Sequence, residues 1–162
     1  MSEKSSRPFG RIGPGLYMGR RPPPNHKLGL VFDAVVLCAY EVQPHAGDYG
    51  RAIVLNVPLD DMTGKPPSEH EQAIAADAGI AVASLIRRGK RVLVTCQQGR
   101  NRSGWVTGIA LIELGVPAQK AIDTIRHVRG EDALSNAHFV EALQHYRRAE
   151  RRPVQATRIS ST

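Results

Sequence analysis

Residues that stabilise a fold by cross-linking are scarce in this sequence. It has only two cysteines, Cys38 and Cys96, among 162 residues, and two cysteines are too few for a disulfide framework. Neither has the cysteine and histidine spacing of a zinc site, and the six histidines are scattered without acidic partners at metal-ligand spacing. We therefore expect no metal site, and each cysteine has to be explained on its own.

Long apolar runs are missing as well. No stretch approaches the roughly 20 apolar residues that cross a bilayer. Residues 1–10 are polar and lack the apolar centre of a signal peptide. From these absences we expect a cytoplasmic protein that has no membrane span.

Aromatic residues make up only 5% of the chain, while its net charge is +7. This charge favours an anionic partner, such as a phosphorylated substrate, a nucleic acid or an acidic membrane surface, without choosing among them. A site that binds nucleic acid would need more exposed aromatic side chains, and Trp105 is expected to pack in the core. We therefore expect no nucleic-acid partner.

The rest of the composition is that of a soluble globular protein, with 41% hydrophobic and 23% charged residues. The length suits one compact domain, and we expect a monomer. Residues 1–9 and 151–162 are rich in Ser, Arg, Pro and Thr without apolar periodicity, so both are expected to be flexible, the second as a basic tail. Residues 10–150 then form the folded domain.

Four segments are expected to be strands. Residues 32–38, 52–57 and 91–95 are short and rich in β-branched residues, which is typical of strands buried on both faces of a parallel sheet. Residues 12–18 contain Pro14 and two glycines, a composition that suits an edge strand.

Helical patterns lie between and after these strands. A capping box that begins at Ser68 predicts a helix over 69–88, and residues 102–114 are apolar almost all round, as in a central helix. Pro117 suits the start of a further helix, and Ser135 is expected to cap the last one. The predicted class is α/β, with a central, mainly parallel twisted sheet flanked by helices.

The stretch VTCQQGRNRSG at residues 94–104 joins a buried strand, which ends at Cys96, to a helix that begins near Arg102. A loop in this position directs successive backbone N–H groups into one concavity, and the helix dipole adds positive potential there. Gly99 permits the positive φ of a tight wrap, and the planar guanidinium of Arg102 can grip two phosphate oxygens. The stretch therefore predicts a phosphate site formed by Gln97, Gln98, Gly99, Arg100, Asn101 and Arg102.

Cys96 is the expected nucleophile of this site. The positive field at a helix N-terminus beside an arginine favours the thiolate, which is the reactive form of cysteine. The hydroxyl of Ser103 is expected to donate a hydrogen bond to the sulfur when the thiolate is expelled. The alternative is that Cys96 is a small buried core residue, but its position at a strand end before a polar loop argues against this.

The segment CQQGRNRS resembles the C-x5-R-[ST] signature of the cysteine-based protein tyrosine phosphatases, especially their compact dual-specificity branch. The signature follows three candidate strands and a capped helix, as in that branch, and weaker matches extend the resemblance over about residues 12–147. The resemblance implies a protein tyrosine phosphatase-like fold. It also implies hydrolysis of phosphotyrosine, with phosphoserine and phosphothreonine as further substrates, through a cysteinyl-phosphate intermediate and without a cofactor.

The resemblance further implies a general acid on a loop that precedes the cysteine. Asp60 and Asp61 lie in such a segment, VPLDDMTG, and the family spacing favours Asp61, with Asp60 as the alternative. A carboxylic acid there would protonate the leaving oxygen and later, as carboxylate, activate water. Asn136 resembles an asparagine that the family places beside the phosphate loop, and a residue that only satisfies a local helix start is an equal explanation.

One departure from the family pattern is Thr95, because the family usually has a histidine immediately before the cysteine. This departure leaves open a module that binds phosphate but turns over poorly. Sulfur transfer of the rhodanese kind, and phosphatase action on phosphoinositides or RNA 5′ phosphates, are further alternatives. Cys38 is expected to be a structural thiol, and the alternative is a reversible disulfide with Cys96 that protects the nucleophile from overoxidation.

Overall fold

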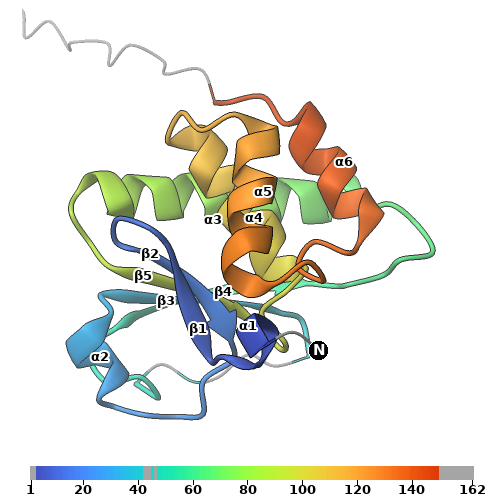
Figure 1. Cartoon of the computed structure of the whole chain (residues 1–162). Helices are drawn as coiled ribbons and strands as arrows, with labels where there is room; N and C mark the ends of the chain where they lie inside the picture. The colour runs from blue at the N-terminus through green and yellow to red at the C-terminus, as the bar shows by residue number, and fades with distance from the viewer. Residues whose placement is uncertain (1–2, 42–44, 46, 150–162) are drawn as a thin grey trace, which may run out of the picture.

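A five-stranded sheet forms the centre of the protein in the computed structural model, which describes residues 3–41, 45 and 47–149 (Figure 1). The strands lie in the order β1-β2-β5-β3-β4. β2, β5, β3 and β4 run parallel to their neighbours, and β1 pairs antiparallel with β2 at one edge. The prediction of a central, mainly parallel sheet is confirmed. The strands are β1 Phe9–Gly13, β2 Leu16–Arg20, β3 Ala34–Ala39, β4 Ile53–Leu59 and β5 Val92–Cys96.

The three strands predicted from β-branched runs are present as β3, β4 and β5. β5 is paired on both of its edges, with β2 and with β3. Every residue of β3 and β5 is buried, as expected for strands covered on both faces. β5 is therefore paired with a strand at each edge and covered on both faces.

Residues 12–18 do not form a single edge strand, so this prediction was wrong. Two strands, β1 and β2, meet there in a hairpin, and Gly15 in its turn has a φ of 74°. Pro14 stands in the same turn, where its missing N–H costs no hydrogen bond of the sheet. The short helix α1 (Glu3–Ser6) and the start of β1 fall within the stretch expected to be flexible, and residues 151–162 lie outside the described part of the chain.

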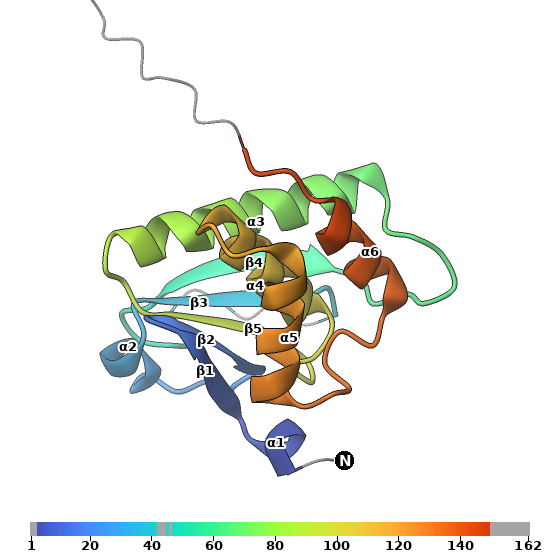
Figure 2. The same cartoon turned by 45° about the horizontal axis from the view of Figure 1, so that its top comes forward.

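The longer helices lie on one face of the sheet (Figures 1 and 2). The first of them begins as predicted, because the side chain of Ser68 accepts the N–H of Glu71 at 3.1 Å. A further short helix, α2, precedes β3 and has no counterpart among the predicted elements. The helices after α1 are α2 Leu28–Val31, α3 Glu69–Arg87, α4 Arg102–Glu113, α5 Ala118–Arg129 and α6 Ala137–His145.

Asn136, and not Ser135, caps helix α6. The side chain of Asn136 accepts the N–H of His138 at 3.1 Å. Serine and asparagine cap helices about equally well. The residue directly before the first helical residue, Ala137, is therefore the one that acts as the cap. The hydroxyl of Ser135 instead lies within hydrogen-bond distance of Asn101.

Helix α4 is the central helix, and all of its residues are buried. Gly104 brings it close to its neighbours, since a Cβ there would press on the side chain of Leu134. The Trp105 indole stacks on the Phe139 ring, with centroids 4.6 Å apart and an interplanar angle of 16°. Burial of large apolar side chains of this kind contributes roughly 1.5–3 kcal/mol each. This packing fixes the N-terminus of α4 against the end of β5.

Shorter segments cover the opposite face of the sheet. Phe32, Tyr49 and Leu93 form a second, smaller apolar cluster there, and Leu28 from α2 packs against it. Within the described residues, none of the helices has the length and apolarity that a membrane crossing requires.

Candidate active site

The segment between β5 and α4 turns its carbonyl groups toward the protein. The carbonyl of Cys96 accepts the N–H of Arg21 at 2.8 Å, and the carbonyl of Arg100 accepts the N–H of Leu134 at 3.2 Å. In a planar trans peptide the C=O and the following N–H point in opposite directions. The N–H groups of Gln97 and Asn101 therefore point away from these two partners.

Gly99 allows this segment to wrap tightly. Its φ is 67°, positive as the sequence predicts, and a Cβ at this position would overlap the carbonyl group of Gly19 in β2. Its own carbonyl accepts a hydrogen bond from Nε of Arg129 at 3.2 Å. Only glycine fits here, because Gly99 packs directly against the backbone of Gly19 in β2.

Arg129 is a buried support for this loop. Only 1% of the residue is exposed, and its Nη1 donates to the carbonyl of Arg7 at 2.8 Å. Burial, together with the charges of Arg20 and Arg100, lowers its pKa from the ordinary arginine value, while the charge of Cys96 acts in the opposite direction. One guanidinium thus joins the loop to the segment before β1.

Cys96 lines a cavity together with residues of this loop. The residue is 4% exposed, and its Sγ lies 3.1 Å from Oγ of Ser103, which is fully buried. A hydroxyl at this distance can donate a hydrogen bond to a thiolate. The hydroxyl of the preceding Thr95 donates to the carbonyl of Val36 at 2.9 Å, so it links β5 to β3.

The guanidinium of Arg102 is held from one end by a carboxylate. Its Nη1 and Nη2 donate to the two carboxylate oxygens of Glu41 at 2.5 and 2.7 Å. Nη1 also donates to the carbonyl of Leu59 at 3.2 Å. Nε of Arg102 is buried and has no hydrogen-bond partner among the residues that the structure describes. The ion pair with Glu41 therefore leaves one N–H of the guanidinium unpaired within the described part of the chain.

The charges of the site act on one another. Burial opposes the charge of Arg102, but hydrogen bonding to Glu41 and the charges of Cys96 and Asp61 outweigh burial and raise the pKa of Arg102. The hydrogen bonds from Arg102 in turn lower the pKa of Glu41. Burial, with a smaller contribution from Cys96, raises the pKa of Cys38 well above that of an ordinary thiol. Cys38 is therefore a neutral thiol beside a charged centre.

Asp61 is fixed by two amide side chains. Its Oδ1 accepts a hydrogen bond from Nδ2 of Asn136 at 2.8 Å, and its Oδ2 accepts one from Nδ2 of Asn101 at 3.0 Å. Asn136 also donates to the carbonyl of Met62 at 3.1 Å. Asn136 caps α6, and it also lies beside the phosphate loop, because its backbone N–H donates to Oδ1 of Asn101 at 3.0 Å.

Asp60 is placed differently from Asp61. It is exposed, and its Oδ1 accepts the backbone N–H of Asp61 at 2.8 Å. Its side chain lines a separate small cavity together with Met62 and Phe139. Of the two aspartates, only Asp61 lines the cavity that contains Cys96.

That cavity has a volume of about 470 Å³ and brings most of the predicted site residues together. Two predicted residues, Gly99 and Ser103, are buried behind its wall. Its wall is formed by Asp61, Cys96, Gln97, Gln98, Arg100, Asn101, Arg102 and Ser135. The cavity is therefore polar, and its wall includes the thiol of Cys96, the guanidinium of Arg102 and the carboxyl group of Asp61.

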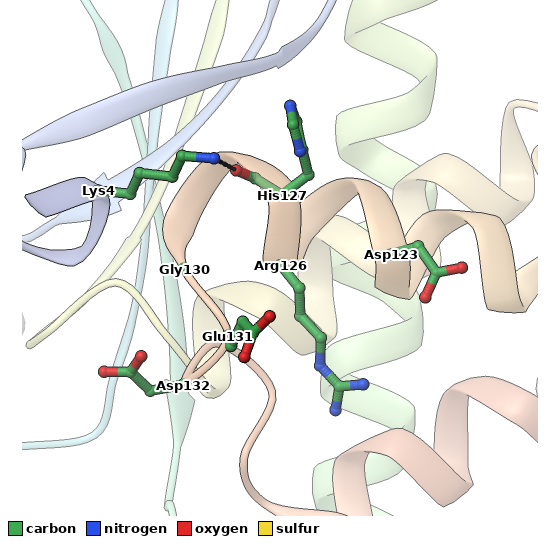
Figure 3. A pocket seen from close by; sticks show the side chains of 7 residues that line it. All are labelled: Lys4, Asp123, Arg126, His127, Gly130, Glu131 and Asp132. Carbon is green, nitrogen blue, oxygen red and sulfur yellow. Dashed lines mark hydrogen bonds between the residues drawn. The ribbon is translucent and has the colours of Figure 1, made fainter. Parts of the chain in front are cut away.

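A larger cavity of about 870 Å³ lies at the carboxyl end of α5 (Figure 3). Nζ of Lys4 donates to the carbonyl of His127 at 3.0 Å. Arg126 donates to the carbonyls of Ala133 and Leu134. These contacts close the end of α5 and fix the segment that leads to Asn136. None of the site residues predicted from the sequence lines this cavity.

Three residues of the site were not predicted as such, and one of them, Ser135, had been expected only as a helix cap. Glu41 follows β3 and lies 61 residues from Arg102 in the chain, in a stretch without a recognisable motif. Arg129 is a basic residue in the last turn of a helix, a position that ordinarily indicates a solvated side chain. The position of Glu41 two residues after β3, which ends near Cys96, was the one signal available.

Comparisons with known proteins agree with this arrangement. Residues 18–149 match the family model described as dual specificity phosphatase, catalytic domain. Dual specificity phosphatase 28 of Mus musculus is 27% identical over 147 residues, which are 90% of this chain and 87% of that protein.

Solved structures show the same likeness. The crystal structure of human DUSP28 is 25% identical, with a TM-score of 0.68 over 85% of this chain and 91% of that chain. The crystal structure of PTPMT1 in complex with PI(5)P is 21% identical, with a TM-score of 0.70 over 85% and 93%, a likeness that bears on the fold alone.

The family match and the site refer to the same part of the molecule. The matched residues begin in β2 and include the loop after β5 and the segment that carries Asp61. The fold is the protein tyrosine phosphatase-like α/β fold expected from the signature. The chain belongs to the dual specificity phosphatase family and is a cysteine-based phosphatase.

Proposed function

We propose that Cys96 is the nucleophile of a two-step hydrolysis. Its Sγ attacks the phosphorus of a bound phosphomonoester, so that an S–P bond forms while the ester O–P bond breaks. Asp61 gives a proton to the departing oxygen, because an alkoxide or phenoxide leaves poorly without one. The observation that carries this proposal is that Cys96, Arg102 and Asp61 line one cavity.

The second step returns the enzyme to its starting state. Asp61, now a carboxylate, takes a proton from a water molecule whose oxygen attacks the cysteinyl phosphate. The S–P bond breaks, inorganic phosphate forms, and the sulfur leaves as thiolate. The hydroxyl of Ser103, 3.1 Å from Sγ, donates a hydrogen bond to this thiolate and so stabilises the leaving group.

Arg102 and the loop N–H groups hold the non-bridging oxygens. Glu41 occupies the terminal nitrogens of the guanidinium from one end, and the buried Nε is left for a phosphate oxygen. Preorganised donors of this kind stabilise the charge that develops in the transition state. No metal or organic cofactor takes part in the proposed steps.

The proposed substrates are phosphotyrosine and, more slowly, phosphoserine and phosphothreonine in proteins. The family membership supports a phosphorylated substrate, and the open polar cavity around Cys96 admits a phosphorylated side chain. A phosphoinositide is the second candidate, because PTPMT1, which shares the fold, has been crystallised with PI(5)P. We also propose that the protein is a monomer located in the cytoplasm.

Phosphate release from a substrate panel tests the proposal. The panel contains peptides with phosphotyrosine, phosphoserine and phosphothreonine, a phosphoinositide and an RNA with a 5′ phosphate. We expect the wild type to act first on phosphotyrosine peptides, and Cys96→Ser to lose turnover while it still binds inorganic phosphate in calorimetry. Equal activity of Cys96→Ser would refute the mechanism.

The same assays separate the rival functions. A module that only binds phosphate would not hydrolyse p-nitrophenyl phosphate, although it would bind inorganic phosphate. A sulfurtransferase would act on thiosulfate and would be indifferent to Asp61→Asn, because sulfur transfer needs no acid on that loop.

A further inference from the structure

A second cavity adjoins the catalytic one at the carboxyl edge of the sheet. It has a volume of about 340 Å³ and is lined by residues 8–9 and 20–23 together with Gln97. Gln97 also lines the cavity that contains Cys96, so the two cavities share this residue. We call the second one the arginine cavity, after Arg20 and Arg21. A substrate held at Cys96 has this cavity within reach of its neighbouring groups.

The backbone places both arginines beside the nucleophile. Arg20 is the last residue of β2 and is the register partner of Cys96 in β5. The N–H of Arg21 donates to the carbonyl of Cys96 at 2.8 Å. Neighbouring strands lie about 4.8 Å apart, so the two arginines begin one strand spacing from the reacting sulfur.

The charge of the arginine cavity is not neutralised within the described part of the chain. Arg20 and Arg21 are both exposed, and neither forms an ion pair with a described carboxylate. The charge of Arg20 instead acts on Arg129 and disfavours its protonated form. Guanidinium groups bind carboxylates and phosphates through paired donors. The cavity therefore offers two cationic groups to an anion of the substrate.

The other walls of the arginine cavity are apolar and stiff. Phe9 is 39% exposed at its edge, and Pro22 and Pro23 have a fixed φ. The carbonyl of Pro22 also accepts a hydrogen bond from the buried Tyr49 hydroxyl at 2.8 Å. An apolar wall suits the aliphatic and backbone atoms of a peptide better than the hydroxyl groups of an inositol ring.

We propose that the arginine cavity binds an acidic side chain next to the phosphorylated residue of a peptide substrate. The proposal rests on the proposed function, since it requires the phosphate to lie at Cys96. An extended peptide advances about 3.3 Å per residue. The acidic residue therefore lies within two positions of the phosphotyrosine, and the site selects acidic phosphopeptides.

Phosphotyrosine peptides that differ at one position test this inference. Each position from two before to two after the phosphotyrosine carries Glu, Gln or Lys in turn, and kcat/KM is measured for each peptide. We expect a preference for Glu over Gln of about threefold to fivefold at one position, the size typical of a partly exposed ion pair. Arg20→Gln and Arg21→Gln should each reduce this ratio toward one.

Arg51→Gln is the matched control, because Arg51 is exposed and precedes β4 at the opposite end of the parallel strands. This control should keep the ratio of the wild type. Arg21→Glu should shift the preference from the Glu peptide to the Lys peptide, a result that partial unfolding cannot produce.

The remaining outcomes overturn the inference in distinguishable ways. A ratio of one at every position, in an enzyme that hydrolyses p-nitrophenyl phosphate, would overturn the inference and leave the proposed function intact. Loss of phosphoinositide hydrolysis in Arg21→Gln, with the peptide ratios unchanged, would assign the cavity to a lipid headgroup instead. Absence of any phosphatase activity would refute both proposals together.

Discussion

Glu41 binds both terminal nitrogens of Arg102 and leaves Nε of the same guanidinium without a described partner. The ion pair fixes the plane of the guanidinium before any substrate arrives. Preorganisation of this kind matters where a donor with one free N–H has to meet a phosphate oxygen in a fixed position. Glu41 is in this sense a positioning residue, since it acts on the substrate only through Arg102.

We predict that Glu41→Ala raises KM for p-nitrophenyl phosphate more than it lowers kcat, with a loss of about tenfold in kcat/KM, since hydrogen bonds to charged groups contribute about 1.5–3 kcal/mol. Glu41→Gln keeps one acceptor oxygen and should lose less. Arg102→Lys is the comparison, because it removes the planar fork itself and should lose both binding and turnover. Steady-state kinetics of the three variants would contradict the prediction if Glu41→Ala left KM unchanged.

The same ion pair predicts how stability depends on pH. Arg102 lowers the pKa of Glu41 in the folded protein, so the contribution of the carboxylate to stability is complete above the ordinary glutamate pKa of about 4.3. This contribution to stability is lost as the pH falls further, through the lowered pKa of Glu41 in the folded protein. The difference in Tm between the wild type and Glu41→Gln should therefore be largest near neutral pH and shrink below about pH 4. Thermal unfolding followed by circular dichroism measures it, and a constant difference would contradict the assignment.

Asp61→Asn should lower kcat by about 10²–10⁴-fold, the usual contribution of a general acid. Asp60→Asn serves as its matched control, because the amide keeps the oxygen that accepts the N–H of Asp61. Each variant removes one negative charge, at neighbouring positions, so an effect of charge alone would lower kcat in both. Kinetics with p-nitrophenyl phosphate and with a phosphoserine peptide distinguish them, since the poorer leaving group should suffer more from Asp61→Asn. Similar losses in both variants would count against Asp61.

Asn136 offers a way to separate the cap from the contact with Asp61. Serine is a good N-cap residue, so Asn136→Ser should keep most of the stability of α6 while it removes the donor to Oδ1 of Asp61. We expect kcat to fall by about tenfold in this variant, the effect of one charge-assisted hydrogen bond, with Tm nearly unchanged. Asn136→Ala should show the same kinetics with a lower Tm. A wild-type kcat in Asn136→Ser would show that Asn101 alone orients the acid.

A disulfide between Cys38 and Cys96 remains a prediction. Leu37 in β3 is the register partner of Thr95 in β5. Cys38 and Cys96 are the next residues along these two neighbouring strands, and the spacing between such strands is compatible with a disulfide. Peroxide would oxidise the Cys96 thiolate to a sulfenic acid, which the Cys38 sulfur attacks with loss of water.

The raised pKa of Cys38 slows this attack at neutral pH, so the disulfide should form faster as the pH rises. Peptide mass mapping after mild peroxide treatment detects the linked peptides. Cys38→Ala should instead become irreversibly inactivated, and an absence of linked peptides at pH 9 would reject the disulfide.

The parts of the fold that local patterns determine were predictable. The strands β3, β4 and β5 follow from β-branched runs, and α3 follows from its capping box at Ser68. Each of these signals lies within a few residues of the element that it specifies. The loop between Cys96 and Arg102 was predictable for the same reason, because the strand, the glycine and the helix start are contiguous.

The remainder depends on contacts between distant segments. Pro14 and the two glycines beside it suggested one edge strand over 12–18, whereas the pairing of β1 with β2 depends on the edge that the folded sheet leaves open. Ser135 and Asn136 are equivalent caps by type, and the helix start that selects Asn136 is fixed by its bond to Asp61. Glu41 has no local signal except its position after β3, because its partner is 61 residues away.

The guanidinium of Arg129 connects the beginning of the chain to the catalytic loop, since it donates to the carbonyls of both Arg7 and Gly99. An affinity tag or a truncation that pulls the segment before β1 out of place would release one of these two acceptors. Loop geometry, and with it catalytic efficiency, should therefore depend on how the N-terminal segment is engineered, whereas β1 itself would still pair with β2. A tag on protein used for kinetics is therefore better placed at the other end of the chain.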